Sequence, residues 1–523
     1  MSHDLNDYFN DGNSATHTFK STIDNNVTVY SDTRAYFADI LKDLTAATEP
    51  EHFVYFAGWW TDIDIPLGDP KAQPLPASLR QALTKLAAGT PGKTQPNVTP
   101  ATAPEPNPGP QICCMSWQTK VQIDYSLLAT LSMVSPLLTM LPDSIFGAYI
   151  LGPINTACFK FVGGLGGNCA SILDKRTRMF GSHHQKFTVI LNGSGLVAYV
   201  GSSDFNADRL YTAGDQSATN PPTTKGAPLN DVNVRITGPA AYDVLKSFVD
   251  RWQAHPDGKD TTLQGATYAP SATAPSGGGG GVTAQVTHTY GVGYPFKDAV
   301  RSAADAQLKL MSTATQYIYF EDQYMIGTAQ IGAALDAQLK AHSDLVVIAV
   351  MAPLAVVDDL PWLVWRRSDF WWPLYNKYGP TENDRVLLFE MLNDNGQDNG
   401  PGSYLHNKMT IVDDAVATVG SVNFSNRSAT HDSEIMISFG GNGGTVPVEV
   451  YVDENIARKV RLMRWSRHLG QSPQQITDLP NAFARWRKLP SNRVRPWVPK
   501  LNTLDPVTYQ AYLKAYSLVF DPA

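Results

Sequence analysis

The chain has 523 residues, of which 43% are hydrophobic and 17% are charged, so it can bury a large core and is too apolar for a disordered protein. Its 48 acidic and 41 basic residues give a net charge of -7, which argues against a dedicated nucleic-acid-binding protein, because such proteins carry a basic excess. The length indicates two domain-sized halves.

The first residues lack the basic stretch and apolar core of a secretory signal peptide. We therefore expect synthesis in the cytoplasm, and any export would use a leaderless route. The cysteines match no zinc-binding spacing, and we interpret them as buried thiols. They are Cys113, Cys114, Cys158 and Cys169.

Short apolar runs predict buried strands in the first half, and amphipathic patterns predict helices. The strands are expected at 53–57, 111–115, 187–191, 196–200 and 232–236, and the helices at 36–46, 76–88 and 240–252.

An apolar insertion at about 121–152 interrupts this half, and no residue between Asp124 and Asp143 is charged. Its length approaches that of a membrane span, but Pro136 and several Ser and Thr residues favour a buried or lid-like helical hairpin. A segment that dips into lipid and a true span are the alternatives.

A stretch rich in Gly, Pro and Ser at 255–285, with five consecutive glycines at 277–281, predicts a linker between the halves. We therefore expect an N-terminal lobe at 1–254 and a C-terminal lobe at 286–523.

In the second half we expect strands at 317–320, 345–350 and 409–412, and helices at 296–313 and 454–469. A second insertion is rich in aromatic residues, which suit either core packing or contact with acyl chains. They are Trp362, Trp365, Phe370, Trp371 and Trp372.

The end of the chain is basic, with eleven Lys or Arg residues and one acidic residue within 458–500. The helix at 454–469 contributes five of these basic residues: Arg458, Lys459, Arg461, Arg464 and Arg467. They predict a solvated basic face, with attraction to anionic lipids or contact with a partner protein as alternatives.

A short phrase occurs once in each half, 222 residues apart. His184-Gln185-Lys186 is followed by the turn 201–204 (Gly-Ser-Ser-Asp), and His406-Asn407-Lys408 by the turn 420–423 (Gly-Ser-Val-Asn). The repeat indicates one site built from two halves. Two imidazoles and two ammonium groups suit a phosphodiester: one imidazole can attack phosphorus, the other can protonate the leaving oxygen, and the ammonium groups can hold the remaining oxygens.

These phrases resemble the phospholipase D superfamily, which is defined by two copies of the motif HxKxxxxD. The second copy fits throughout, with His406, Lys408 and Asp413 followed by the turn 420–423 and by Glu434. Segments at 58–60, 317–324, 404–414 and 464–470 are similar to segments of the eukaryotic-type branch. The resemblance covers most of the chain outside the linker, the insertions and the C-terminal tail. It implies an α/β fold of two lobes, each a mixed β-sheet flanked by helices, related by a pseudo-twofold axis.

The first copy departs from the motif, because Leu191 stands where Asp is expected. In the family this Asp supports the structure and does not touch phosphorus. We therefore expect local repacking around Leu191, with activity retained. A structural role is also expected for His183.

The resemblance implies a role for each site residue. It makes His184 the nucleophile and His406 the general acid and base, although the residues alone do not distinguish this from the reverse. It pairs Asp231 with His184 and Glu434 with His406, each carboxylate fixing the ring through Nδ1. Around the phosphate oxygens it places Lys186, Lys408, Asn423, Ser202, Asp204 and Ser421, with Asp413 as structural support. It implies no metal and no cofactor.

We therefore expect a phospholipase D that hydrolyses the distal phosphodiester bond of glycerophospholipids, or exchanges its alcohol, through a phosphohistidine. A nuclease of the same superfamily is the first alternative, which the acidic total disfavours. The others are a cardiolipin-synthase-like phosphatidyltransferase and, because of Leu191, a catalytically impaired lipid-binding relative.

The expected partner is a phospholipid membrane surface, with which a monomer associates peripherally, and no nucleic acid is expected. Eukaryotic-type motifs without an N-terminal lipid-targeting domain suggest a bacterial protein. A leaderless lipase of this kind raises the hypothesis of an antibacterial or host-directed effector with a secretion-system or immunity partner. Detection only in the producer's cytosol, even during contact with competitors, would contradict it.

Overall fold

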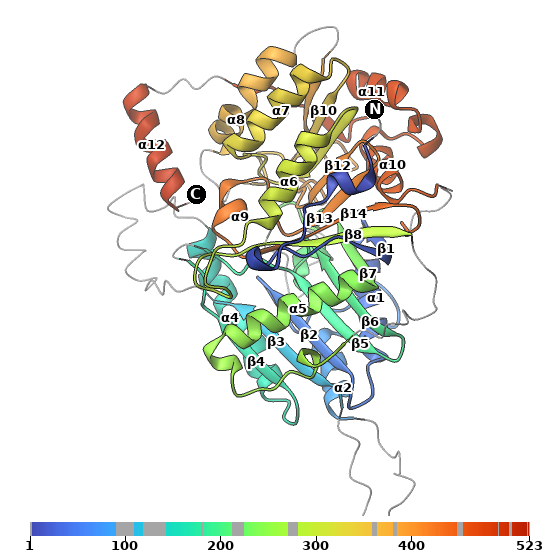
Figure 1. The fold of residues 1–523 in the computed structure, drawn as a ribbon, viewed down its shortest axis with the longest axis vertical. Coiled ribbons are helices and arrows are strands. Elements are labelled where there is room, and N and C mark those ends of the chain that lie inside the picture. Colours follow the sequence, from blue (N-terminus) through green and yellow to red (C-terminus); the bar gives the residue numbers. More distant parts are fainter. Residues whose placement is uncertain are drawn as a thin grey trace, which may run out of the picture.

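The computed structural model describes residues 3–89, 109–118, 143–178, 181–211, 224–269, 281–357, 363–379, 384–446, 453–489, 491–500, 505–519 and 521. The fold is mixed α/β, as predicted, with two lobes stacked along the long axis (Figure 1). Residues 121–142 of the predicted apolar insertion, and Trp362 of the second insertion, lie outside the described residues.

The strands of the described residues form one sheet, in the order β15-β11-β10-β9-β12-β13-β14-β8-β1-β7-β6-β5-β2-β3-β4. Lobe 1 contributes β1 (Thr22–Tyr30), β2 (Phe53–Gly58), β3 (Gln111–Trp117), β4 (Ala170–Asp174), β5 (Phe187–Asn192), β6 (Gly195–Gly201) and β7 (Asn233–Thr237). Lobe 2 contributes β8 (Val282–Thr289), β9 (Tyr317–Asp322), β10 (Val346–Met351), β11 (Val386–Met391), β12 (Lys408–Val412), β13 (Val416–Gly420), β14 (Glu434–Gly441) and β15 (Val494–Pro496).

The two lobes repeat one strand order. Reading outward from the antiparallel contact of β1 with β8, lobe 1 runs β1-β7-β6-β5-β2-β3-β4 and lobe 2 runs β8-β14-β13-β12-β9-β10-β11. Both orders place the strand that follows each His-x-Lys phrase, β5 or β12, at the same position. The predicted pseudo-twofold relation of two mixed α/β lobes is therefore confirmed, and the strands of the two lobes join in one sheet.

Helices cover both faces of this sheet. They are α1 (Thr33–Thr45), α2 (Leu79–Ala87), α4 (Asp143–Gly163), α5 (Pro239–Ala254), α6 (Ser302–Thr313), α7 (Ala329–Ala341), α8 (Leu363–Tyr378), α9 (Asn426–Thr430), α10 (Ile456–Leu469), α11 (Leu479–Lys488) and α12 (Pro506–Val519). One core cluster, which includes Phe248 of α5 and Trp465 of α10, extends across both lobes, and each lobe has its own cluster on the other face. Because both faces are covered, parallel strands such as β9 and β10 are buried at every residue, which explains their continuous apolar runs.

Every predicted strand and helix is present, with shifted ends. The predicted helix at 296–313 begins only at Ser302, because the backbone of Val300 exchanges two hydrogen bonds with Tyr290. The helix predicted at 76–88 begins at Leu79, where Ser78 and Gln81 form a capping box.

The predicted linker at 255–285 is too wide. Residues 256–258 and 264–266 form 3₁₀ turns, and β8 begins at Val282. Leu263 is buried in the core, and the amide of Gly265 donates to the hydroxyl of Tyr55 at 2.9 Å. These contacts attach the first part of the segment to lobe 1.

The first residues of the chain lie against lobe 2, although the N-terminal lobe was expected to begin at residue 1 (Figure 1). Tyr8 is buried and its hydroxyl lies 3.3 Å from Asp413, and the amide of Asn10 donates to Gln285 of β8. The chain therefore reaches lobe 1 only at β1.

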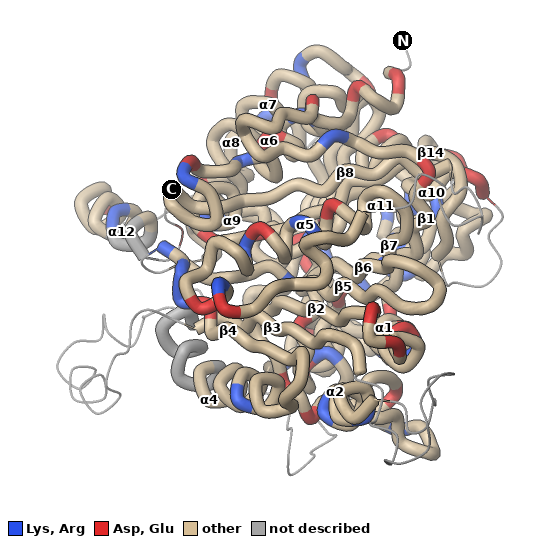
Figure 2. The backbone as a smooth tube through the Cα atoms, turned by 60° about the horizontal axis from the view of Figure 1, so that its bottom comes forward, with Lys and Arg blue, Asp and Glu red and all other residues tan. Residues whose placement is uncertain are grey.

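The predicted basic face on the helix at 454–469 is wrong for two of its five residues. Arg461 and Arg464 of α10 are buried and pair with Asp414 at 2.7 Å and Glu321 at 2.8 Å. These arginines neutralise carboxylates beneath the helix and are not presented to solvent or lipid. More generally, the charged residues gather on helices and loops, while the strands are mostly uncharged (Figure 2).

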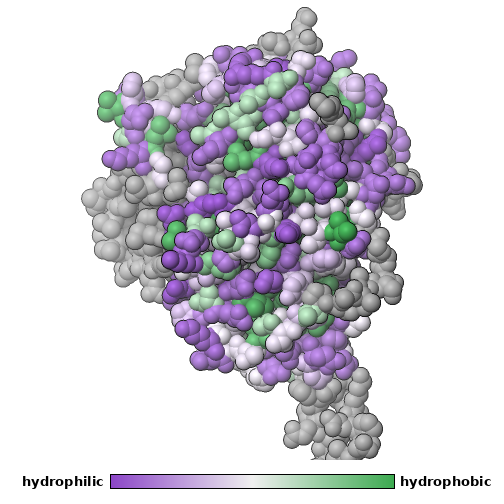
Figure 3. All heavy atoms as spheres, in the orientation of Figure 1, coloured by the Kyte–Doolittle hydropathy of each residue, from purple (hydrophilic) through white to green (hydrophobic). Residues whose placement is uncertain are grey.

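The aromatic insertion forms α8 and packs inward. Trp371 is buried and its indole Nε1–H donates to the carbonyl of Met325 at 3.1 Å, while Phe370 packs against Trp371 and Phe424. Core packing is therefore the role of these two rings. On the face drawn in Figure 3, apolar residues are scattered among polar ones.

The cysteines are free thiols, as predicted, and three of them are buried; Cys169 is partly exposed. None of the helices in the described part of the chain combines the length and the apolar character that a bilayer crossing requires.

Candidate active site

The two histidines are held where the lobes meet. His184 lies just before β5, and its amide donates to the carbonyl of Ser433 at 2.9 Å. His406 lies just before β12, and its amide donates to the carbonyl of Asn230 at 2.8 Å. Each histidine backbone is therefore fixed against the strand start of the opposite lobe.

The side chains follow the same crossed arrangement. Nδ1 of His184 lies 3.1 and 3.0 Å from the two carboxylate oxygens of Glu434, and Nδ1 of His406 lies 2.7 Å from Oδ1 of Asp231. The predicted pairs, Asp231 with His184 and Glu434 with His406, are therefore wrong. Each carboxylate directly follows the residue that accepts the amide of the opposite histidine, so it reaches that ring and not the ring of its own lobe.

A serine supports each carboxylate. The hydroxyl of Ser202 donates to Asp231 and that of Ser421 to Glu434, both at 2.5 Å, and both serines are buried. Ser202 and Ser421 were predicted to bind substrate. The structure instead shows them holding the carboxylates that orient the histidines.

The two lysines lie beside the histidines and are buried. Lys186 Nζ donates to the carbonyl of His184 at 3.0 Å, and Lys408 Nζ donates to the carbonyl of His406 at 2.6 Å. Burial lowers the pKa of both ammonium groups, that of Lys408 to about 7. Two buried cations of this kind suit an anionic group between them.

The charges of the two lobes act on each other. Burial lowers the pKa of His184 well below its usual range, and the charges of Lys186 and Lys408 lower it further. Burial, Lys408 and Arg209 likewise lower the pKa of His406. Burial and the nearby cations thus favour the neutral form of both rings, and a bound anion would favour protonation of one of them.

The two carboxylates differ in their surroundings. Arg209, the seventh residue after Ser202, lies 3.3 Å from Asp231, whereas Ser428, the seventh after Ser421, donates its hydroxyl to Glu434 at 2.6 Å. Burial would raise the pKa of Asp231, but Arg209 and His406 outweigh it and hold that pKa well below the usual range. Burial and the nearby Asp432 raise the pKa of Glu434 to about 8.

Asp204 supports Lys186 and the loop after β2. Its carboxylate accepts from the amides of Trp59 and Trp60 at 3.1 and 3.0 Å, and lies 3.4 Å from Lys186 Nζ. It was predicted to bind substrate, but its two oxygens are occupied by the protein. Asn423 stands at the matching position of lobe 2, and its buried side-chain carbonyl has no hydrogen-bond partner within the described residues.

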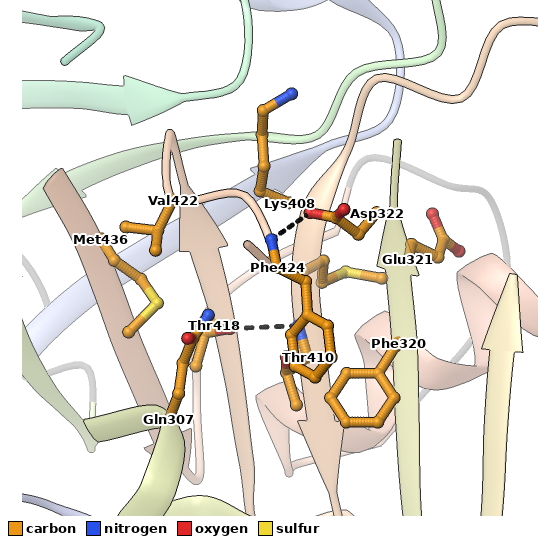
Figure 4. A pocket seen from close by; sticks show the side chains of 11 residues that line it. Gln307, Phe320, Glu321, Asp322, Lys408, Thr410, Thr418, Val422, Phe424 and Met436 are labelled. Atoms are coloured by element: carbon orange, nitrogen blue, oxygen red, sulfur yellow. Dashed lines mark hydrogen bonds between the residues drawn. The ribbon is translucent and has the colours of Figure 1, made fainter. Parts of the chain in front are cut away.

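In lobe 2 the carboxylate beside Lys408 is Asp322, which ends β9, whereas Asp204 of lobe 1 follows β6. Asp322 faces Lys408 in the register of β9 and β12, and accepts from the amide of Phe424 at 2.8 Å (Figure 4). A small pocket lies next to this pair, and its lining mixes apolar and polar side chains. The apolar ones are Phe320, Met409, Val422, Phe424 and Met436. Burial is the main cause of the low pKa of Lys408.

An aromatic ring flanks each histidine edge to face. Trp59 lies 6.0 Å from His184 and Tyr404 lies 6.1 Å from His406, between ring centroids. The Lys186 ammonium lies 5.6 Å from the centre of the Trp59 ring. These rings help to keep water from the imidazoles.

The carboxylate of Asp413 holds backbone amides at the start of β9. It lies beyond the catalytic groups and accepts from the amides of Thr315, Gln316 and Tyr317 at 2.7–2.8 Å, at the start of β9. Leu191, at the matching place in lobe 1, pairs with Phe53 and Leu196 and packs against the core. Leu191 is thus accommodated as an apolar residue, and the retention of activity expected there stays a prediction.

The buried His183 is also structural. Its Nδ1 lies 3.1 Å from Asp174, which Arg251 contacts at 2.6 Å.

Sequence reasoning missed several residues of the site. Arg209, Ser428, Asp322 and Gln323 were not singled out, although Gln323 accepts from Lys408 Nζ at 2.6 Å. Trp59, Asp322 and Gln323 belong to segments whose similarity to the family was noted, and that similarity was the available signal. Arg209 and Ser428 could have been found by aligning the two repeats from their Gly-Ser turns.

Comparison with known proteins agrees with this geometry. The family model described as "Cardiolipin synthase, PLD-like domain" matches residues 308–443. Cardiolipin synthase 2 of Staphylococcus epidermidis is 27% identical over 258 residues, 49% of this chain and 44% of that protein. Phospholipase D alpha 2 of Oryza sativa subsp. japonica is 24% identical over 404 residues, with 55% of this chain and 49% of that protein covered. The chain thus spans about half the length of these relatives.

A solved structure shows the same fold along nearly the whole chain. The crystal structure of phosphatidylserine synthase from Haemophilus influenzae Rd KW20 has a TM-score of 0.50 and 10% identity, with 94% of this chain and 93% of that chain covered. The fold is thus shared with this structure, and residues 308–443, which hold the second histidine–lysine pair and Glu434, match the PLD-like domain of the phospholipase D superfamily.

Proposed function

We propose that the protein cleaves the distal phosphodiester bond of glycerophospholipids and transfers the phosphatidyl group to water or to an alcohol. The observation that carries this proposal is the pair of crossed histidine–carboxylate contacts, flanked by two buried lysines. Two imidazoles and two cations at one buried point suit a tetrahedral phosphorus centre with negative oxygens.

The contacts of His184 suit a nucleophile. Its Nδ1 lies 3.1 Å from the carbonyl oxygen of Ser421, which can only accept a hydrogen bond. Nδ1 therefore carries the proton, and Nε2 keeps its lone pair. In the first step Nε2 attacks phosphorus, and the bond from phosphorus to the headgroup oxygen breaks.

The contacts of His406 suit the proton donor. Asp231 is ionised and lies against Nδ1, so it stabilises the imidazolium form of the ring. His406 Nε2 gives its proton to the leaving headgroup oxygen, and then takes a proton from the incoming water or alcohol. That oxygen forms its bond to phosphorus as the bond to His184 breaks, and the electron pair returns to Nε2.

Lys186 and Lys408 would hold the non-bridging oxygens, with Asn423 beside them. A lipid substrate is supported by the names of the relatives, cardiolipin synthase and phospholipase D. The net charge of -7 disfavours a polyanionic nucleic acid as substrate. A second candidate, phosphatidyl transfer to the hydroxyl of another phospholipid, is favoured by the cardiolipin synthase match at 308–443.

Phosphorus NMR on mixed phospholipid vesicles, with and without ethanol, tests the proposal. Phosphatidic acid in water and phosphatidylethanol in ethanol are expected, and both should be lost in His184→Ala and His406→Ala. Cardiolipin formed from phosphatidylglycerol alone would select the second candidate. Release of nucleotides from DNA without any change in the lipids would refute both.

A further inference from the structure

A carboxylate from far along the chain is buried against the active-site region. Asp521 follows α12 and is only 2% exposed. Its Oδ1 accepts from the amide of Arg427 at 2.8 Å, its Oδ2 accepts from the side-chain amide of Asn426 at 2.8 Å, and Arg366 of α8 lies 3.6 Å away. Asp521 thus joins the first turn of α9 to α8.

Helix α9 needs such support because it has only five residues. So short a helix is unstable alone, and its first amides have no partner within the helix. Ser425 accepts from the amide of Ser428 at 3.3 Å, and Asp521 supplies the acceptor for Arg427. An anion at a helix N-terminus is also favoured electrostatically.

Two chains of contacts run from α9 to His184. In one, the Ser428 hydroxyl donates to Glu434 at 2.6 Å, and Glu434 contacts Nδ1 of His184. In the other, Arg427 donates to Asp432 at 2.6 Å, and Asp432 accepts from the amide of Ser182, two residues before His184. Both begin at residues of the helix that Asp521 holds.

We propose that Asp521 is a positioning residue, which fixes α9 so that Ser428 keeps Glu434 aligned with His184. The predicted loss of phospholipid turnover rests on the proposed function. The alignment of Glu434 with His184 is a property of the free protein and does not depend on it. Asp521 touches neither histidine, and it acts through Arg427 and Ser428.

The test compares Asp521→Ala with a matched control, Asp344→Ala, which removes an exposed carboxylate in the turn before β10. Asp521→Ala is expected to lower kcat on phospholipid vesicles about tenfold, because small misplacements of a catalytic group are costly, while Asp344→Ala leaves kcat unchanged. In a Ser428→Ala background, Asp521→Ala should lower kcat less than about twofold, because the contact between Ser428 and Glu434 is already lost. An equal loss in both backgrounds, or no loss, would overturn the proposal.

A second measurement does not depend on lipid turnover. The Cε1–H signal of His184, identified by its absence in His184→Ala, is followed by NMR in the free protein. It should shift in Asp521→Ala and stay in place in Asp344→Ala. An unshifted signal refutes the positioning role even if no phospholipid is cleaved, whereas a shifted signal without turnover refutes only the proposed function.

Discussion

Nδ1 of His406 lies 2.7 Å from Oδ1 of Asp231, although the two residues belong to different lobes. Glu434 of lobe 2 contacts His184 of lobe 1 in the same way. Neither lobe alone therefore contains His184 or His406 together with the carboxylate that orients it, and the site exists only when the two lobes are joined.

The crossing predicts which variants will behave alike. Asp231→Asn should resemble His406→Ala, and Glu434→Gln should resemble His184→Ala, each with a loss of about 100-fold or more in turnover. A phosphatidyl ester of p-nitrophenol separates the two classes, because its leaving group needs no proton. A rapid-mixing measurement should show a burst of nitrophenolate for Asp231→Asn and none for Glu434→Gln. If each carboxylate instead oriented the histidine of its own lobe, the burst would appear for Glu434→Gln and not for Asp231→Asn.

Asp413 and Leu191 should differ in what they contribute to stability. Asp413→Ala leaves three backbone amides near β9 without their acceptor, so we expect a loss of about 3 kcal/mol in the free energy of unfolding. Leu191→Asp should cost about 2 kcal/mol, because a carboxylate replaces a side chain packed against the core. Urea unfolding measures both; greater stability in Leu191→Asp would show that the motif Asp suits lobe 1.

Arg209 and Ser428 occupy matching positions but should not be equivalent. Arg209→Gln leaves Asp204 and Asp231 buried without their shared cation, and should cost about 3 kcal/mol of folding free energy as well as activity. Ser428→Ala removes one hydrogen bond and should cost about 1 kcal/mol. Chemical denaturation compares the two, with Arg209→Lys as the variant that keeps the charge. Equal losses of unfolding free energy in Arg209→Gln and Ser428→Ala would contradict the different roles of these two residues.

Lys408 should set the alkaline limit of activity. Because burial lowers its pKa to about 7, it loses its charge above that pH in the free protein, and kcat/KM should fall there. The Asp322 carboxylate raises the pKa of Lys408, so Asp322→Asn should move the fall to lower pH. A kcat/KM profile from pH 5 to 9 checks this, with Asp505→Asn as control. If Asp322→Asn moved the fall in kcat/KM to higher pH, Lys408 would not be the group that sets the alkaline limit.

The sequence predicted the strands that are apolar along their length, such as β2, β9 and β10, because burial on both faces leaves a continuous signal. It missed β1, β4, β8, β11, β13, β14 and β15, including the buried apolar strands β11 and β13. Of the missed strands, β1, β8 and β14 lie where the lobes meet. In β8 the polar residues Gln285, Thr287 and His288 are buried and hydrogen-bonded, so the run does not look like a core strand.

The site residues were found from the repeat, but their pairing was not. Asp231 lies 47 residues from His184 and 175 from His406, so proximity in the sequence favours the wrong partner. The correct pairing depends on how one lobe sits on the other, which no local pattern records. The two buried arginines of α10 were misread for a similar reason, since Asp414 and Glu321 come from distant segments.

Two identical subunits meeting on an exact twofold axis would surround both imidazoles with the same neighbours. Any mutation that improved one ring as an attacking group would then change the other as well. Joined in tandem, the halves are free to diverge, and here one has an arginine where the other has a serine. Covalent linkage thus lets this protein refine attack and proton delivery separately.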